Sequence, residues 1–202
     1  MSRDVYLPRT GDIILSNTYT VLSRLATGVF GTPYGHVGVC VRIDDTPLLY
    51  SISLEQPKPS LISLGDYLAQ PVVMAATVRE LRVPLNREEE DKFKKILIKY
   101  EYVSHNSFHT RLHDMRDGHV GTNFTGMGDT AFVQAILQDM GMMEQSASTV
   151  VSTAFFMPSS RRDRLDSYYK DTLSPLISKN YTVEQAKTIL AKQVGLLVDL
   201  LI

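Results

Sequence analysis

Short apolar stretches rich in β-branched residues recur along the chain, and they predict strands. Residues 11–15 read GDIIL, residues 36–43 read HVGVCVRI, and residues 72–83 contain another such run. Residues 48–54, LLYSISL, follow the second run after the sequence DDTP, which is typical of a turn. We therefore predict a β-hairpin that is closed by a four-residue turn at 44–47.

Other stretches repeat their apolar residues with the spacing of a helix. Asn86 and Asp129 are good N-caps for two of the helices, and Gly141 is a good stop for the second. The pattern predicts helices at 16–31, 61–70, 86–102, 129–140 and 182–202.

The order of these elements predicts an α+β domain in which helices flank a small antiparallel sheet. We expect residues 1–160 to form this domain and residues 161–202 to be a C-terminal extension with an amphipathic helix. The polar, His-rich residues 103–127 are expected to be a long loop. Residues 150–156 are expected to be a strand or a buried extended segment.

The predicted hairpin has one apolar and one polar face. With a turn at 44–47, Ile43 lies opposite Leu48 and His36 lies opposite Glu55. The apolar face then carries Val37, Val39, Val41 and Ile43. The polar face carries His36, Cys40, Ser51, Ser53 and Glu55. Gly38 lies on that polar face and leaves space for a ligand or for another backbone.

His36 and Cys40 are four residues apart, which raises the question of a cysteine–histidine dyad. Four residues of a strand span ~13 Å, whereas a nucleophile and its base need to be about 3 Å apart. The two residues are therefore not a dyad. Cys40, the only cysteine, is expected to be a small buried hydrophobic residue.

The composition bears on which partners the protein binds and in which compartment it lies. The 202 residues include 21 basic and 22 acidic ones, so the net charge of −1 argues against a broad nucleic-acid surface. A single cysteine suits a reducing compartment. The sequence has neither a signal-peptide core nor an apolar run of transmembrane length. We expect a protein that is not secreted and lies in the cytoplasm or inside a viral particle.

The segments GDIIL, YGHVGVCVRID and the later helix GDTAFVQAIL, in this order, resemble the circularly permuted papain-like hydrolases. These form the permuted branch of the NlpC-type superfamily, with lecithin retinol acyltransferase-like, bacterial lipoprotein-type and poxvirus relatives. The resemblance covers about residues 10–157 and implies a permuted papain-like fold. It also implies that His36 is the acid or base, and that Ser51, or else Ser53, orients its imidazole.

The resemblance implies a nucleophilic cysteine at the start of the later helix, but this chain has Asp129 there. A carboxylate does not replace a thiolate in the usual acyl-transfer cycle, and Asp129 is also an ordinary N-cap. We therefore expect a degenerate, non-hydrolytic domain with a binding or structural role, plausible for a virion or assembly component. The alternative is an amide or ester hydrolase or acyltransferase that uses His36 with Thr130 or with a water oriented by Asp129.

Two further features bear on ligands and partners. His105, His109 and His113 are spaced by four residues, as metal ligands on one helix face are, but the segment is polar and interrupted by glycine. We therefore expect a solvated, His-containing loop or helix face there and no metal site. We expect no cofactor. The C-terminal helix ends on Leu200, Leu201 and Ile202, and we expect this apolar end to pack on the domain or to bind a protein partner or a second copy.

Overall fold

The computed structural model describes residues 6–20, 31–53, 58–101, 104–105, 126–127, 129–143, 153–158, 165, 167–182, 184–189 and 191–192. Within these residues the fold is mixed α/β and is built on one antiparallel sheet of six strands, in the order β4-β3-β2-β1-β5-β8. The strands are β1 (Ile13–Thr18), β2 (His36–Ile43), β3 (Thr46–Ser51), β4 (Ser60–Ser63), β5 (Val73–Arg79) and β8 (Ser174–Ser178). The helices are α2 (Leu64–Ala69), α3 (Arg87–Lys99), α5 (Asp129–Asp139) and the short 3₁₀ helix η1 (Thr153–Phe156). Two further strands, β6 (Ser104–His105) and β7 (Gly126–Met127), form a separate parallel pair.

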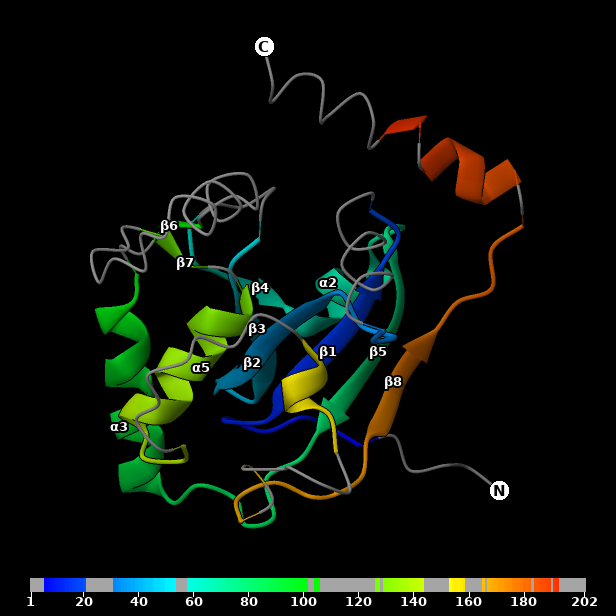
Figure 1. The fold of residues 1–202 in the computed structure, drawn as a ribbon. Helices are drawn as coiled ribbons and strands as arrows, with labels where there is room; N and C mark the ends of the chain where they lie inside the picture. The colour runs from blue at the N-terminus through cyan, green and yellow to red at the C-terminus, as the bar shows by residue number, and fades with distance from the viewer. Residues whose placement is uncertain are drawn as a thin grey trace.

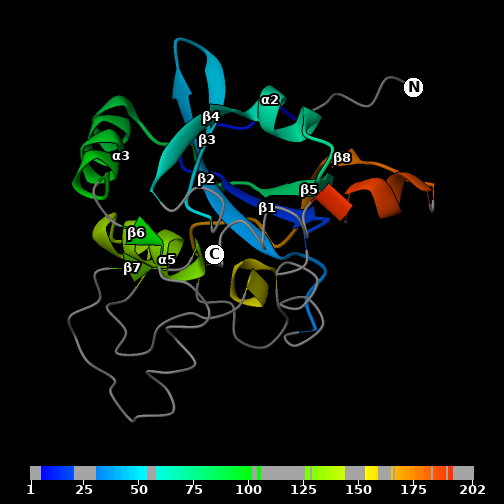
Figure 2. The same ribbon diagram turned by 90° about the horizontal axis from the view of Figure 1, so that it is seen from above.

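Helices cover both faces of the sheet (Figures 1 and 2). The helices α3 and α5 and the short helix η1 lie on one face, and α2 lies on the other. Two hydrophobic clusters result, because alternate residues of each strand point to opposite faces. The chain thus has a three-layer arrangement that buries the central strands on both sides.

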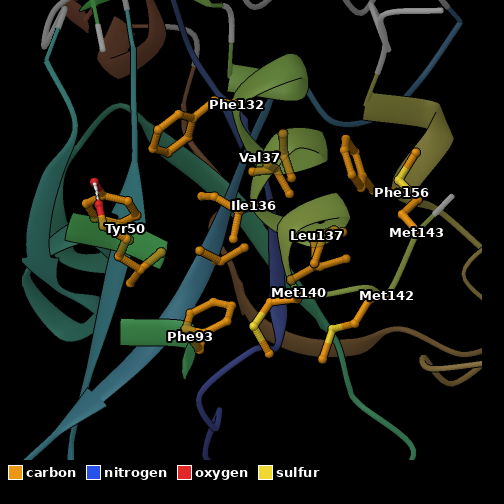
Figure 3. Packing of buried hydrophobic residues seen from close by; sticks show 14 of the residues in the cluster. Val37, Tyr50, Phe93, Phe132, Ile136, Leu137, Met140, Met142, Met143 and Phe156 are labelled. Atoms are coloured by element: carbon orange, nitrogen blue, oxygen red, sulfur yellow. Dashed lines mark hydrogen bonds between the residues drawn. The ribbon is translucent and has the colours of Figure 1, made fainter. Parts of the chain in front are cut away.

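The larger cluster lies between the sheet and α5 (Figure 3). Phe132, Ile136 and Leu137 of α5 are fully buried against the sheet. The helix ends at Asp139, and Gly141 follows with a φ of 76°, which permits the hydrogen bond from Met142 N to Leu137 O. This turn directs the chain back to the core, where Met140, Met142 and Met143 are buried.

The smaller cluster corrects the prediction that one face of the hairpin is polar. Cys40 is fully buried there with Ile14 and Leu49, beneath Leu64 and Tyr67 of α2. The sequence prediction was wrong because it did not foresee that α2 covers this face. The opposite face is as predicted for Val37, Val39 and Val41, which are in the larger cluster, whereas Ile43 is 43% exposed at the hairpin end.

The hairpin turn has two residues, not the predicted four. Asp44 and Asp45 have φ angles of 47° and 64°, and Ile43 pairs with Thr46. Two successive positive φ angles are the signature of a type I′ turn, whose twist matches that of the strands. Each residue of β2 consequently lies opposite a residue of β3 that is two positions earlier in the sequence than predicted. Cys40, for example, lies opposite Leu49.

Several other elements differ from the predicted ones. Residues 16–18 continue β1 instead of beginning a helix, and residues 21–30 of that predicted helix lie outside the described part. The predicted helix at 61–70 begins as the edge strand β4 and becomes helical at Leu64, where Ser63 is the N-cap. The described residues of the predicted strand 150–156 form the 3₁₀ helix η1. In contrast, α3 begins at its predicted N-cap, Asn86, which forms a capping box with Glu89.

The sheet also crosses the division expected at residue 160. The strand β8 pairs with β5, so residues 174–178 belong to the same sheet as the N-terminal strands. The sequence did not reveal β8 because SPLIS is short and contains a proline, which an edge strand tolerates. Beyond it, residues 184–189 and 191–192 are helical, as predicted for the C-terminal segment.

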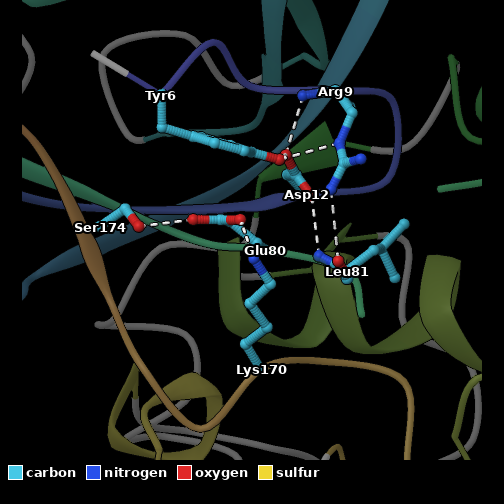
Figure 4. Close-up of polar contacts among 7 residues, drawn as sticks. All are labelled: Tyr6, Arg9, Asp12, Glu80, Leu81, Lys170 and Ser174. Carbon is cyan, nitrogen blue, oxygen red and sulfur yellow. Dashed lines mark hydrogen bonds and ion pairs between the residues drawn. The ribbon is translucent and has the colours of Figure 1, made fainter. Parts of the chain in front are cut away.

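Polar contacts fasten the N-terminal segment and the segment before β8 to the end of β5 (Figure 4). The carboxylate of Asp12 accepts hydrogen bonds from the backbone of Arg9 and Leu81 at 2.8 and 2.9 Å. Glu80 accepts hydrogen bonds from Lys170 and Ser174. Burial of Glu80 works against ionisation, but the two donors and the Lys170 charge hold the pKa of its carboxyl below the usual value.

Within the described residues, no helix combines the length and the apolar content that crossing a bilayer requires.

Candidate functional site

The structure brings together two of the candidate residues, His36 and Asp129. His36 is the first residue of β2, and Asp129 is the first residue of α5, which packs along that strand. The His36 Nδ1 lies 3.0 Å from the Asp129 Oδ2, although 92 residues separate them. The two side chains are 12% and 20% exposed. The pair is thus shielded from most solvent while one edge of it reaches the surface.

The Asp129 carboxylate accepts three hydrogen bonds. Its Oδ2 accepts from His36 Nδ1 and, at 3.2 Å, from the backbone N–H of Val37. Its Oδ1 accepts from the backbone N–H of Thr130 at 2.8 Å. Since an ionised carboxylate only accepts, the proton of a neutral His36 lies on Nδ1, and Nε2 carries the lone pair. The start of a helix is also where the helix dipole favours a negative charge.

The serines expected to orient His36 come from β3 and the residues after it. The two-residue turn changes their register. The ladder runs to the pair Val39 and Tyr50, so its continuation puts Ser51 opposite Gly38 and Ser53 opposite His36. Glu55, predicted to lie opposite His36, falls outside the described residues. The expected partner Ser51 is therefore two residues along the strand from His36.

Gly38 of β2 lies close against β3. A Cβ atom there would lie 2.9 Å from both the Ser51 Cβ and the Tyr50 carbonyl oxygen, and 2.7 Å from a Leu49 methyl carbon. Real Cβ atoms essentially never come so close to backbone. Of the two interpretations left open for this glycine, the structure supports the approach of another backbone.

Thr130 and Cys40 are both poorly placed for chemistry. The Thr130 residue is only 4% exposed. Cys40 is fully buried, and desolvation together with the nearby Asp12 charge raises the pKa of its thiol to about 12. Cys40 is thus a hydrophobic residue of the core, as the spacing along β2 predicted.

The histidine run cannot be placed at this site. His109 and His113 lie outside the described residues, and of His105 only the backbone strand β6 is described. Among the residues that the structure does describe, no group of three or more His, Cys, Asp or Glu side chains could hold a metal ion.

Two residues next to His36 were not singled out from the sequence. Ser16 of β1 is the Cα partner of His36, and its Oγ lies 2.5 Å from the hydroxyl of Tyr67 in α2. The Tyr67 and His36 ring centroids are 6.2 Å apart and the rings are tilted by 43°. The alternation of β1 could have revealed Ser16 if residues 16–18 had been assigned to a strand. Nothing in the local sequence places Tyr67, because α2 reaches the site only through tertiary packing.

Comparison with known proteins yields a similarity to solved structures, and this similarity bears on the fold. No family model matches the chain, and none of the curated proteins matches it. One solved structure that is similar is the metalloprotein yiiX from Escherichia coli O157:H7, DUF1105. It is 16% identical, superposes with a TM-score of 0.54, and the match covers 67% of this chain and 67% of that chain. At this identity the similarity concerns the fold alone.

Proposed function

We propose that this protein is a degenerate permuted papain-like domain that no longer hydrolyses through a cysteine and acts as a binding or structural protein. The observation that carries the proposal is the contact between Asp129, at the start of α5, and His36, at the start of β2. The resemblance to the permuted papain-like hydrolases implies that the nucleophile and its histidine stand at these two positions.

The chemistry of the Asp129 carboxylate supports a structural role for the pair. A papain-like cycle needs a thiolate that attacks the acyl carbon and a histidine that returns the proton to the leaving group. In this site both carboxylate oxygens already accept hydrogen bonds, and two of the three donors belong to β2. Asp129 thereby links α5 to β2. A stabilising role explains this link, whereas a nucleophilic role does not require it.

The resemblance to the poxvirus branch leads us to propose a role in a virion or an assembly. Such a role requires a defined fold and a binding surface, and it does not require turnover.

A second candidate function, amide or ester hydrolysis or acyl transfer, is favoured by one observation. Asp129 bonds the Nδ1 of His36, and this orients Nε2 as a base in the way that a carboxylate orients the histidine of a hydrolytic triad. The base would then act on a water molecule, since Thr130 is almost fully buried. This candidate predicts slow turnover that depends on both His36 and Asp129.

The position of the missing nucleophile is tested by Asp129→Cys. Cys40 is buried with a raised pKa, so the introduced thiol is the one that iodoacetamide reaches in the folded protein. Next to His36 and at the start of α5, this thiol should have a low pKa. We expect its alkylation at pH 6 to be at least tenfold faster than that of Asp139→Cys, a thiol at the opposite end of the same helix.

Two controls complete the experiment. Adding His36→Ala to Asp129→Cys should abolish most of the advantage, and circular dichroism should show that both cysteine variants are folded. Equal alkylation rates at positions 129 and 139 would contradict the papain-like assignment. The absence of turnover is tested separately with p-nitrophenyl esters and peptide amides, and hydrolysis by the wild type that disappears in His36→Ala would favour the second candidate.

A further inference from the structure

We infer that Tyr67, fixed by Ser16, is the positioning residue for His36, in the role that the sequence resemblance gives to Ser51 or Ser53. The inference deepens the proposed function and rests on it in one respect, which is that His36 is the central group of the site. Its physical basis is a contact among three elements, β1, β2 and α2.

Ser16 and His36 are directly opposite each other in the antiparallel pair β1–β2. Cross-strand partners project their side chains to the same face of the sheet, with Cβ atoms about 5 Å apart. The Ser16 hydroxyl is therefore a near neighbour of the imidazole. It is also only 1% exposed, so it needs a hydrogen-bonding partner that is itself buried.

That partner is the Tyr67 hydroxyl, 2.5 Å from the Ser16 Oγ and likewise shielded, since Tyr67 is 8% exposed. The hydrogen bond determines where the Tyr67 ring lies. The ring centroid is 6.2 Å from that of His36, within the range in which two aromatic rings attract each other. His36 thus has two neighbours from different helices, the Asp129 carboxylate of α5 and the Tyr67 ring of α2.

The serines of β3 are less suited to this role. Ser51 lies against the Cα of Gly38, where an added Cβ would come within 2.9 Å of its own Cβ. It is therefore packed against Gly38, the next residue after His36 on this face of β2. Ser53 lies beyond the end of β3, so its place opposite His36 rests on a continued register and not on a strand pair.

A positioning role for Tyr67 has a specific consequence for His36. With the ring beside it, the imidazole keeps the orientation in which Nδ1–H donates to Asp129. Loss of the Ser16–Tyr67 hydrogen bond lets the Tyr67 ring turn and lets water reach the imidazole. The Nδ1–H proton should then exchange faster with water.

The experiment uses the full chain with ¹⁵N-labelled histidine and follows the His36 ring by NMR. Tyr67→Phe retains the ring and removes the hydroxyl, and Ser16→Ala removes the other end of the same bond. We expect both variants to accelerate Nδ1–H exchange about tenfold or more. Ser51→Ala and Ser53→Ala are the matched controls, and they should leave the Nδ1–H exchange rate unchanged.

Clear outcomes separate the alternatives. If Ser51→Ala or Ser53→Ala changes the His36 signals and Tyr67→Phe does not, the inference is wrong and the serine has the role. If Tyr67→Phe lowers only the melting temperature, Tyr67 is merely a packing residue. The readout does not depend on activity or on a thiol at position 129, so it can succeed or fail independently of the alkylation test of the proposed function.

Discussion

The contact between Asp129 and β2 predicts that the residue at the nucleophile position stabilises the fold. Asp129→Ala removes the acceptor of His36 Nδ1–H and of the Val37 backbone N–H, and Val37 is fully buried. A hydrogen bond to a charged group contributes about 1.5–3 kcal/mol, and a buried donor left without an acceptor costs about 1–3 kcal/mol. The lost charge at the start of α5 adds about 0.3–1 kcal/mol.

These contributions are not all lost in full, because the Asp129 side chain is 20% exposed and water can replace part of its bonding. We therefore expect Asp129→Ala to lower the free energy of unfolding by about 2–4 kcal/mol. Asp129→Asn keeps the shape and one oxygen acceptor but loses the charge, so it should cost about half as much. This order, alanine worse than asparagine, follows from the hydrogen bonds and not from the volume removed.

The measurement is urea unfolding of the wild type, the two Asp129 variants, His36→Ala and the double variant His36→Ala/Asp129→Ala. The cycle should give a coupling energy of about 1 kcal/mol or more between the two side chains. A loss below about 0.5 kcal/mol for Asp129→Ala would refute the structural role of the carboxylate. A stabilising effect of that substitution would instead be typical of a strained functional site.

Three further predictions concern the turn, the strand contact and the polar network. Gly38→Ala should destabilise the protein by about 1–3 kcal/mol in thermal unfolding, because the new methyl group meets Ser51 and the backbone of β3. Asp45→Gly should raise the free energy of unfolding by about 0.5–1 kcal/mol, because a type I′ turn needs a positive φ at this position. Glu80 has a lowered pKa, so its stabilising effect is present above the unfolded-state pKa of about 4.3 and is lost as the pH falls through the folded-state value. Unfolding of Glu80→Gln should therefore show a weaker loss of stability between about pH 5 and 3 than the wild type.

Each of these predictions has a control in the same chain. Gly65→Ala lies in α2, where an added Cβ meets only the Ser63 Oγ at 3.6 Å, so it should be neutral or stabilising. Asp45→Val should destabilise the hairpin, since a β-branched residue resists positive φ. Glu184→Gln removes one partner of an exposed ion pair with Lys187 and should leave the pH profile unchanged. A clear destabilisation by Gly65→Ala, a stabilisation by Asp45→Val or a changed pH profile in Glu184→Gln would contradict the stated mechanisms.

Local signals in the sequence determined the elements that are formed by neighbours along the chain. The capping box of Asn86 and Glu89 begins α3 where the sequence predicts, because both partners lie within one helical turn. Gly141 ends α5 for the same local reason. Residues 36–43 form β2 with the predicted bounds, and the spacing within this strand was enough to exclude a dyad of His36 with Cys40.

Other features depended on the partner that the chain meets in space. The register of the hairpin depends on the positive φ angles of Asp44 and Asp45, which make the turn two residues long. The residue composition of the turn did not specify these angles. Residues 60–63 and 174–178 form strands by pairing with β3 and β5 at the two edges of the sheet, although neither segment has a strong strand pattern. The second face of β2 is buried around Cys40 because α2 covers it.

The candidate site divides in the same way. The sequence by itself determined that His36 begins a strand, that Asp129 begins a helix, and that no cysteine stands at the start of that helix. Only the tertiary structure decided that the carboxylate bonds the imidazole and that Ser16 and Tyr67 lie beside it. The reason is physical: element starts depend on bonds within a few residues, whereas a contact across 92 residues depends on how the buried faces of β2, α2 and α5 pack.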